Sequence, residues 1–175
     1  MKRKDVNRIL SLLLLLLIVA VIAIVHLSIR QRERELLNAS SAAHAVQVMN
    51  LATQVELFSN DYVMATRDYL NSRDTAFAVN MQVNKERIIT HLELLKKLEL
   101  ENTEQQKYID SMRIAADQLF KTAEPVNAVA FQGFTRKEQV ELLEKVRPLM
   151  RISLEDIRKN SIQLIAIEAE KKEAG

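Results

Sequence analysis

Residues 37–70 read LNASSAAHAVQVMNLATQVELFSNDYVMATRDYL, without a glycine or a proline. The apolar residues of this stretch, together with Ser41 and His44, recur at alternating steps of three and four. That spacing is typical of the buried face of an α-helix. The stripe consists of Leu37, Ser41, His44, Val48, Leu51, Val55, Phe58, Tyr62, Ala65 and Tyr69. It predicts a long amphipathic helix that packs against other helices.

The same spacing recurs in three further segments, so the chain is expected to form four helices. Turns are predicted at residues 71–74, 101–103 and 132–134, the last of which holds the only internal glycine. Asn102 has the position of a helix N-cap, and Thr135 with Glu138 has the spacing of a capping box. The helices of the bundle are expected at about residues 30–72, 75–99, 103–132 and 136–173.

Short turns between long helices favour an all-α, up-down-up-down four-helix bundle. The first and fourth helices are the long pair, so both ends of the bundle are expected to return to the same side. Pro125 and Pro148 fall inside the third and fourth helices. Each proline is expected to bend or break its helix locally, because proline lacks the amide hydrogen and clashes with the preceding turn.

The composition is typical of long helices and excludes several kinds of site. The 175 residues include two glycines, two prolines and no cysteine, and 48% of them are hydrophobic. So few glycines exclude the glycine-rich loops that bind phosphate groups, and the lack of cysteine excludes disulfides and thiolate zinc sites. Four of the basic residues precede residue 9 and the remainder of the chain is near neutral. No basic surface for nucleic acid is therefore expected.

Residues 9–29 read ILSLLLLLLIVAVIAIVHLSI and contain no Lys, Arg, Asp or Glu. A helix of this length spans about 30 Å, the thickness of the hydrocarbon core of a bilayer. We therefore expect a transmembrane helix here; a cleaved signal peptide, the alternative, has a shorter apolar core. Four basic residues precede the run and three follow it closely, which favours a cytoplasmic tail at residues 1–8 and places residues 30–175 outside the cytoplasm.

The polar residues show no arrangement typical of catalysis or of metal binding. The histidines are His26, His44 and His91, and none belongs to a Glu-x-x-His pair of the kind that di-iron bundles use. With the first two helices antiparallel, His91 lies near Val55 and about 16 Å along the axis from His44, too far for both to bind one haem. We expect no cofactor, no metal ion and no enzymatic activity.

Several motifs resemble the third class of CHASE domains, the cyclase/histidine-kinase-associated sensory extracellular modules. His44 stands where that family has a histidine near the start of its first long helix, and residues 67–70 (RDYL) resemble its Arg-Gly-Tyr-Leu element. Residues 149–152 (LMRI), with Glu168 further on, resemble its last helix. The resemblance covers about residues 30–173. The sensor bundles of chemoreceptors share the same architecture and are the next candidate.

The resemblance implies a sensory input domain of a signal-transduction receptor, such as the histidine kinase of a two-component system or a chemotaxis receptor. Such a receptor would sit in the bacterial inner membrane with most of this chain in the periplasm or outside the cell. It would respond to a small ligand or a periplasmic partner protein. The sequence ends at Gly175 before a second membrane span or an output region. The alternative is a stand-alone, membrane-anchored helical interaction protein.

Four residues are the candidates for contact with a ligand or for signalling: Arg67, Tyr69, Asp61 and His44. Three of them belong to the motifs that carry the resemblance. A homodimer is also expected. The stripe at Leu37 and Ser41 continues beyond the part of the first helix that the short second and third helices can cover, and a second copy would bury it.

Overall fold

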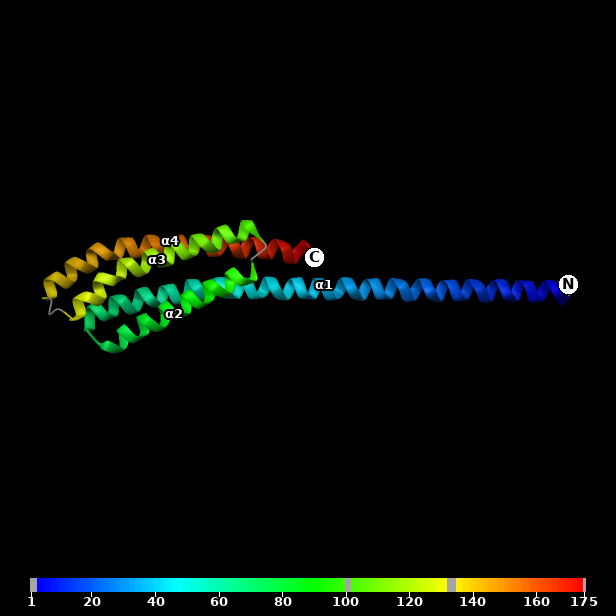
Figure 1. Ribbon diagram of the computed structural model, residues 1–175, viewed down its shortest axis with the longest axis horizontal. Coiled ribbons are helices and arrows are strands. Elements are labelled where there is room, and N and C mark those ends of the chain that lie inside the picture. The colour runs from blue at the N-terminus through cyan, green and yellow to red at the C-terminus, as the bar shows by residue number, and fades with distance from the viewer. Residues whose placement is uncertain (1–2, 100–101, 132–134, 175) are drawn as a thin grey trace. The chain divides into compact units, whose positions relative to one another are not determined.

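The computed structural model describes the backbone of residues 3–99, 102–131 and 135–174, and their side chains apart from 3–15, 18, 37, 127–131 and 171–174. These residues form four α-helices and no strand (Figure 1). The helices are α1 (Arg3–Ser72), α2 (Thr75–Leu98), α3 (Thr103–Phe131) and α4 (Arg136–Ala174). The expectation of an all-α chain with four helices is confirmed.

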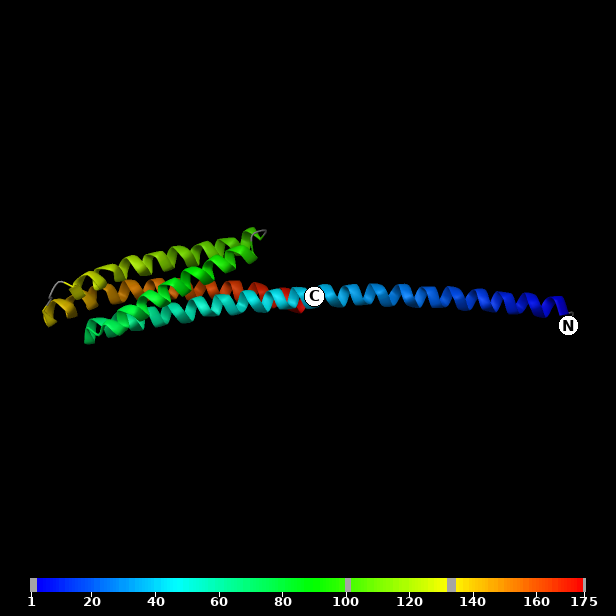
Figure 2. The same cartoon turned by 60° about the horizontal axis from the view of Figure 1, so that its bottom comes forward.

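The chain divides into two compact units, with residues 1–43 in the first and His44–Ala174 in the second. In the first unit the described residues form one helix, which is the first part of α1. In the second unit the rest of α1 and the other three helices run antiparallel to their neighbours in sequence (Figures 1 and 2). This arrangement is an up-down-up-down bundle.

The predicted transmembrane helix at residues 9–29 needs correction. In the part of the chain whose residues the structure describes, no helix is long and apolar enough to cross a bilayer. The side chains of residues 9–15 and 18 lie outside the described residues, and from Val19 only a short apolar run remains before the charged residues that begin at Arg30. A spanning helix needs about 20 apolar residues. The prediction of a single-pass inner-membrane location is therefore wrong.

The core of the bundle is built from the predicted stripes. On α1 the side chains of Val48, Val55, Tyr62 and Tyr69 are all buried. The other helices contribute buried apolar residues at the same three-and-four spacing, among them Met81, Ile88, Leu92, Leu95, Ile109, Met112, Leu119, Met150, Ile157 and Leu164. Because each helix presents one apolar stripe, the four stripes meet in a single continuous core.

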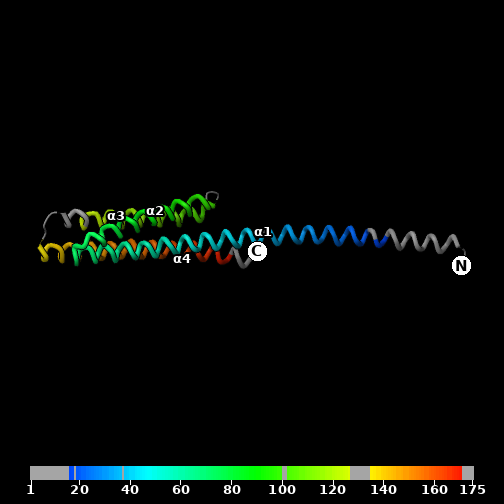
Figure 3. The backbone as a smooth tube through the Cα atoms, turned by 90° about the horizontal axis from the view of Figure 1, so that it is seen from below, coloured from blue at the N-terminus to red at the C-terminus, as the bar shows by residue number. Residues whose placement is uncertain are grey.

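Contacts between side chains show that α1 packs against α2 and α4. The ring of Phe58 meets that of His91 on α2 edge to face, with centroids 5.2 Å apart. Figure 3 shows α4 beside α1 in the second unit, and Arg158 Nε on α4 lies 3.5 Å from Glu56 Oε1. The sequence analysis expected His91 to lie near Val55. His91 instead contacts Phe58, three residues further along α1, so the predicted register of α1 and α2 is correct to within one helical turn.

The turn between α1 and α2 depends on two residues. Arg73 has a φ of 58°, the left-handed conformation that often ends a helix, and its N–H donates to the Tyr69 carbonyl at 2.8 Å. Asp74 is the N-cap of α2, because its carboxylate accepts a hydrogen bond from the Ala76 N–H at 2.9 Å. α1 ends at Ser72 and α2 begins at Thr75, so the break between them falls within the predicted residues 71–74.

The caps of α3 and α4 also follow from the sequence. Asn102 Oδ1 accepts a hydrogen bond from the Gln105 N–H, and Glu138 and Thr135 form the two reciprocal bonds of a capping box. The predicted turn at residues 132–134 lies outside the described residues. Both α3 and α4 continue past their prolines, Pro125 and Pro148, so neither proline breaks its helix.

Candidate functional site

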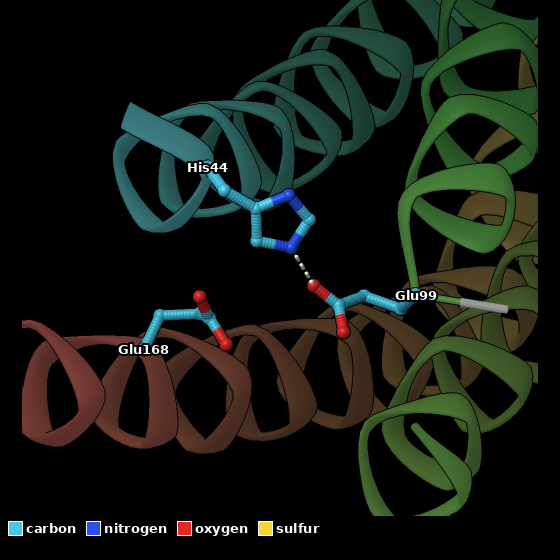
Figure 4. Close-up of side chains that lie close together, drawn as sticks. All are labelled: His44, Glu99 and Glu168. Carbon is cyan, nitrogen blue, oxygen red and sulfur yellow. Dashed lines mark hydrogen bonds and ion pairs between the residues drawn. The ribbon is translucent and has the colours of Figure 1, made fainter. Parts of the chain in front are cut away.

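Three side chains with metal-binding or proton-exchanging groups meet at one end of the bundle (Figure 4). His44 comes from α1, Glu99 follows the last residue of α2, and Glu168 comes from α4. His44 Nε2 lies 2.7 Å from Glu99 Oε1, and one ligand atom from each residue lies within 4.8 Å of the other two. Glu99 and Glu168 are buried, at 4% and 1% exposure, whereas the side chain of His44 is 40% exposed.

Backbone hydrogen bonds hold Glu99 in place at the end of α2. Its N–H donates to the Leu95 carbonyl at 3.1 Å. Its own carbonyl accepts from the Asn102 N–H at 3.0 Å and from the side-chain amide of Gln106 at 2.9 Å. The last turn of α2 and the first turn of α3 therefore fix the Glu99 backbone, from which the carboxylate reaches His44.

Gln105 connects α3, the one helix without a member in this group, to the three side chains. This α3 residue is fully buried, and its Nε2 donates a hydrogen bond to Glu168 Oε1. Its amide oxygen is also buried and has no hydrogen-bond partner among the described residues. We call His44, Glu99, Gln105 and Glu168 the polar layer; each of the four helices or its cap supplies one member.

The polar layer is unusual in its charges. Two carboxylates come close together in a largely buried place, where their repulsion is screened less than in water. The imidazole of His44 is the basic group of the layer and at most offsets one negative charge. Burying carboxylates costs free energy unless hydrogen bonds or opposite charges compensate. A cluster of this kind is well suited to bind a cation or a basic ligand.

The structure brings only one of the four sequence-predicted site residues into the polar layer. Arg67 lies 23 residues beyond His44 on the same helix, about 34 Å along its axis. The guanidinium of Arg67 is about half exposed and pairs with its neighbour Asp68 at 3.0 Å. Asp61 is partly buried and Tyr69 is buried. His44 and the other three candidates therefore belong to different levels of the bundle.

Glu99, Gln105 and Glu168 were missed by the sequence reasoning, although two signals pointed toward them. The stripe of the fourth helix, through Ile157, Ser161 and Leu164, reaches Glu168 at the next step of four. A charged residue in a core position of this kind is rare unless it is paired. The antiparallel register also placed the end of the second helix opposite His44.

A second feature is a surface cleft of about 460 Å³ formed by α1, α2 and α3. Tyr62 and Tyr69 line it together with Lys85, whose ammonium group lies 5.2 Å from the centre of the Phe120 ring. The rings of Tyr62 and Phe120 pack edge to face at 5.3 Å. Burial raises the pKa of Tyr62 to about 12. The cleft contains one of the predicted site residues, Tyr69, but not Arg67 or Asp61.

Comparison with known families gives one match. The family model of the CHASE3 domain matches residues 38–174, which is most of the chain and includes all of the polar layer. No curated protein and no solved structure matches the chain significantly. CHASE3 domains are sensory, extracellular-type input domains of receptors, and the resemblance noted in the sequence is confirmed. The chain belongs to the CHASE3 domain family.

Proposed function

We propose that this chain is the signal-receiving input domain of a signal-transduction receptor, such as a histidine kinase or a chemoreceptor, and that the polar layer is where the signal acts. One observation carries the proposal: in a bundle of a sensory family, the four helices meet in a buried group of polar side chains. A ligand or ion that binds there would contact side chains from α1, from the end of α2 and from α4, and Gln105 of α3 is bonded to one of them.

The expected mechanism is a shift between two arrangements of the helices. The layer joins His44 on α1 to Glu99 at the end of α2, and Gln105 on α3 to Glu168 on α4. A signal that changes the bonding within the layer favours one arrangement of α1 relative to α4 over another. Because a ligand shifts an equilibrium only through its different affinities for the two states, the layer must differ between them.

We further propose that the domain acts as a homodimer through α1. His44, part of the sequence-predicted seam, contacts Glu99 of its own chain, so the dimer would use the opposite, exposed face of α1. Val46, Leu57 and Met64 on α1 are about half exposed, and a second copy could cover them. Arg67 stays a candidate signalling contact, since an exposed pair with the adjacent Asp68 contributes little to stability.

The proposal is tested by joining the chain after Gly175, in continuous helical register, to the transmitter region of a histidine kinase. Glu168→Gln should change the autophosphorylation rate of this fusion protein, because it alters the charge of the layer without changing the side-chain volume. Glu170→Gln, at an exposed position on the same helix, is the matched control and should leave the rate unchanged. Equal rates for all three proteins would contradict the proposal and favour the alternative, a helical interaction protein without its own output.

A further inference from the structure

We infer that the polar layer is a binding site for a divalent transition-metal ion of the zinc type, with His44, Glu99 and Glu168 as its protein ligands. This inference rests on the proposed function in one respect, that the ion is the signal which the domain receives. The binding of the ion does not depend on whether the domain controls a kinase. It also reverses the expectation from the sequence that the chain holds no metal site.

The distances within the layer suit such an ion. Zinc binds imidazole nitrogen and carboxylate oxygen at about 2.0–2.2 Å, so its tetrahedral ligand atoms lie about 3.4 Å from one another. One ligand atom each from His44, Glu99 and Glu168 already lies within 4.8 Å of the others. Changes in the side-chain torsions of the two long glutamates would adjust these separations, closing the wider ones and opening the 2.7 Å between His44 Nε2 and Glu99 Oε1. The hydrogen bond between His44 and Glu99 would be replaced by two bonds to the metal.

The charges of the layer suit a divalent ion as well. A neutral imidazole with two carboxylates carries a charge of −2, which one divalent cation balances. The three groups come from α1, from the end of α2 and from α4, so the ion would tie these elements together. Metal binding of this kind stabilises the folded state, because the unfolded chain does not hold the ligands together.

Gln105 supplies the hydrogen bond that orients a ligand carboxylate in a metal site. Ligand carboxylates in metal sites are themselves hydrogen-bonded, which orients them, and Gln105 Nε2 donates such a bond to Glu168. The amide oxygen of Gln105 is buried and without a hydrogen-bond partner among the described residues. It belongs to the same amide group, so it lies beside the cluster and can accept a hydrogen bond from a metal-bound water. The 40% exposure of His44 leaves a path for the ion and a place for that water.

The ligand types distinguish between classes of cation. Calcium takes six to eight oxygen ligands and magnesium an octahedron of oxygens, whereas the layer offers one imidazole and two carboxylates. Imidazole with carboxylate suits zinc, cobalt, nickel and copper. Three protein ligands with an open position for water or an external ligand are also the pattern of accessible zinc sites. We therefore name zinc as the probe and magnesium as the negative control.

The test uses the full chain, freed of metal with a chelator and titrated with zinc chloride by isothermal calorimetry. One zinc ion should bind per chain, the unfolding temperature should rise, and magnesium should do neither. His44→Gln and Glu168→Gln should each weaken zinc binding by about tenfold or more, the scale of loss seen even for outer-shell residues. His91→Gln is the matched control; that histidine donates from Nδ1 to the Arg87 carbonyl and lies outside the layer, so zinc affinity should be unchanged.

Cobalt supplies a second measurement that does not depend on how the variants fold. Bound in a tetrahedral site with nitrogen and oxygen ligands, Co²⁺ should give a visible absorption band in the wild-type protein, and zinc should abolish that band. Absence of zinc binding, binding that His44→Gln and Glu168→Gln leave intact, or equal binding of magnesium would each overturn the metal site.

The outcomes also separate this inference from the proposed function. If zinc binds as described but does not alter the autophosphorylation of the kinase fusion, the metal site stands and its role as the signal fails. If zinc does not bind but Glu168→Gln still changes the output, the input-domain proposal stands and the metal site is refuted.

Discussion

Replacing Tyr62 with phenylalanine should make the free energy of unfolding less sensitive to alkaline pH. The Tyr62 side chain is only 3% exposed and its ring packs against that of Phe120. Burial raises the pKa of its hydroxyl from 10.0 to about 12, because the charged phenolate is poorly solvated inside the bundle. Between these two values the unfolded chain loses the phenolic proton while the folded chain keeps it.

The sign and size of the effect follow from this difference. A raised pKa contributes stability that is fully present below pH 10 and is lost as the pH rises toward 12. One pKa unit corresponds to about 1.4 kcal/mol, so the wild-type bundle should lose about 1.4 kcal/mol through Tyr62 between pH 8 and pH 11. Tyr62→Phe keeps the ring and removes the titrating group. Its loss of stability over the same range should be smaller by that amount.

Urea unfolding followed by far-UV circular dichroism at the two pH values measures this difference. With a typical denaturant slope, about 1.4 kcal/mol moves the midpoint by about 0.5–1.4 M urea. Titration of the tyrosinate absorbance should also show that Tyr62→Phe removes a step near pH 12. The same loss of stability in both proteins would refute the reasoning, because it would mean that the Tyr62 hydroxyl is as well solvated in the folded state as in the unfolded one.

Three further predictions concern the core, a helix cap and the dimer. Leu164→Ala removes a fully buried side chain and should cost about 2–5 kcal/mol of unfolding free energy in urea, whereas Ile162→Ala, half exposed on the same helix, should cost far less; similar losses would contradict the packing of α4. The pKa of Glu138 is lowered, first by a hydrogen bond from the backbone N–H of Thr135 and then by one from its side chain. Protection of the Thr135 amide from hydrogen exchange should therefore be highest at neutral pH and fall as acid protonates this carboxylate. Glu138→Ala should remove this pH dependence in hydrogen exchange, and a persistent dependence would assign it to another group. If the proposed homodimer pairs the first helices through the face of Val46, Leu57 and Met64, mild oxidation should crosslink Ala39→Cys, which lies on that face, faster than Ser41→Cys on the predicted stripe. Faster crosslinking of Ser41→Cys would favour the predicted stripe instead, and equal, slow crosslinking would argue against pairing through α1.

Local features of this protein could be predicted from the sequence because their causes lie within a few residues. The three-and-four spacing identified the buried face of α1, and Val48, Val55 and Tyr62 are indeed buried. The capping box and the Asn102 cap form the hydrogen bonds that their residue types predict. The prediction of a membrane span at residues 9–29 was wrong. It rested on a count of apolar residues along the sequence, whereas no helix among the described residues is long and apolar enough to cross a bilayer.

The sequence by itself determined the four helices, the face that each buries, the caps at Asn102 and at Thr135 with Glu138, and membership of the CHASE3 family. Only the tertiary structure decided which polar residues meet: Glu99 lies 55 residues from His44, and Glu168 lies 63 residues from Gln105. An apolar stripe shows which side of a helix is buried, but it repeats at every turn and so does not specify which levels of two helices face each other. The lengths of the turns and the fit of the side chains set that register. This is why one predicted site residue, His44, lies in the polar layer while its three partners appeared only once the helices were placed side by side.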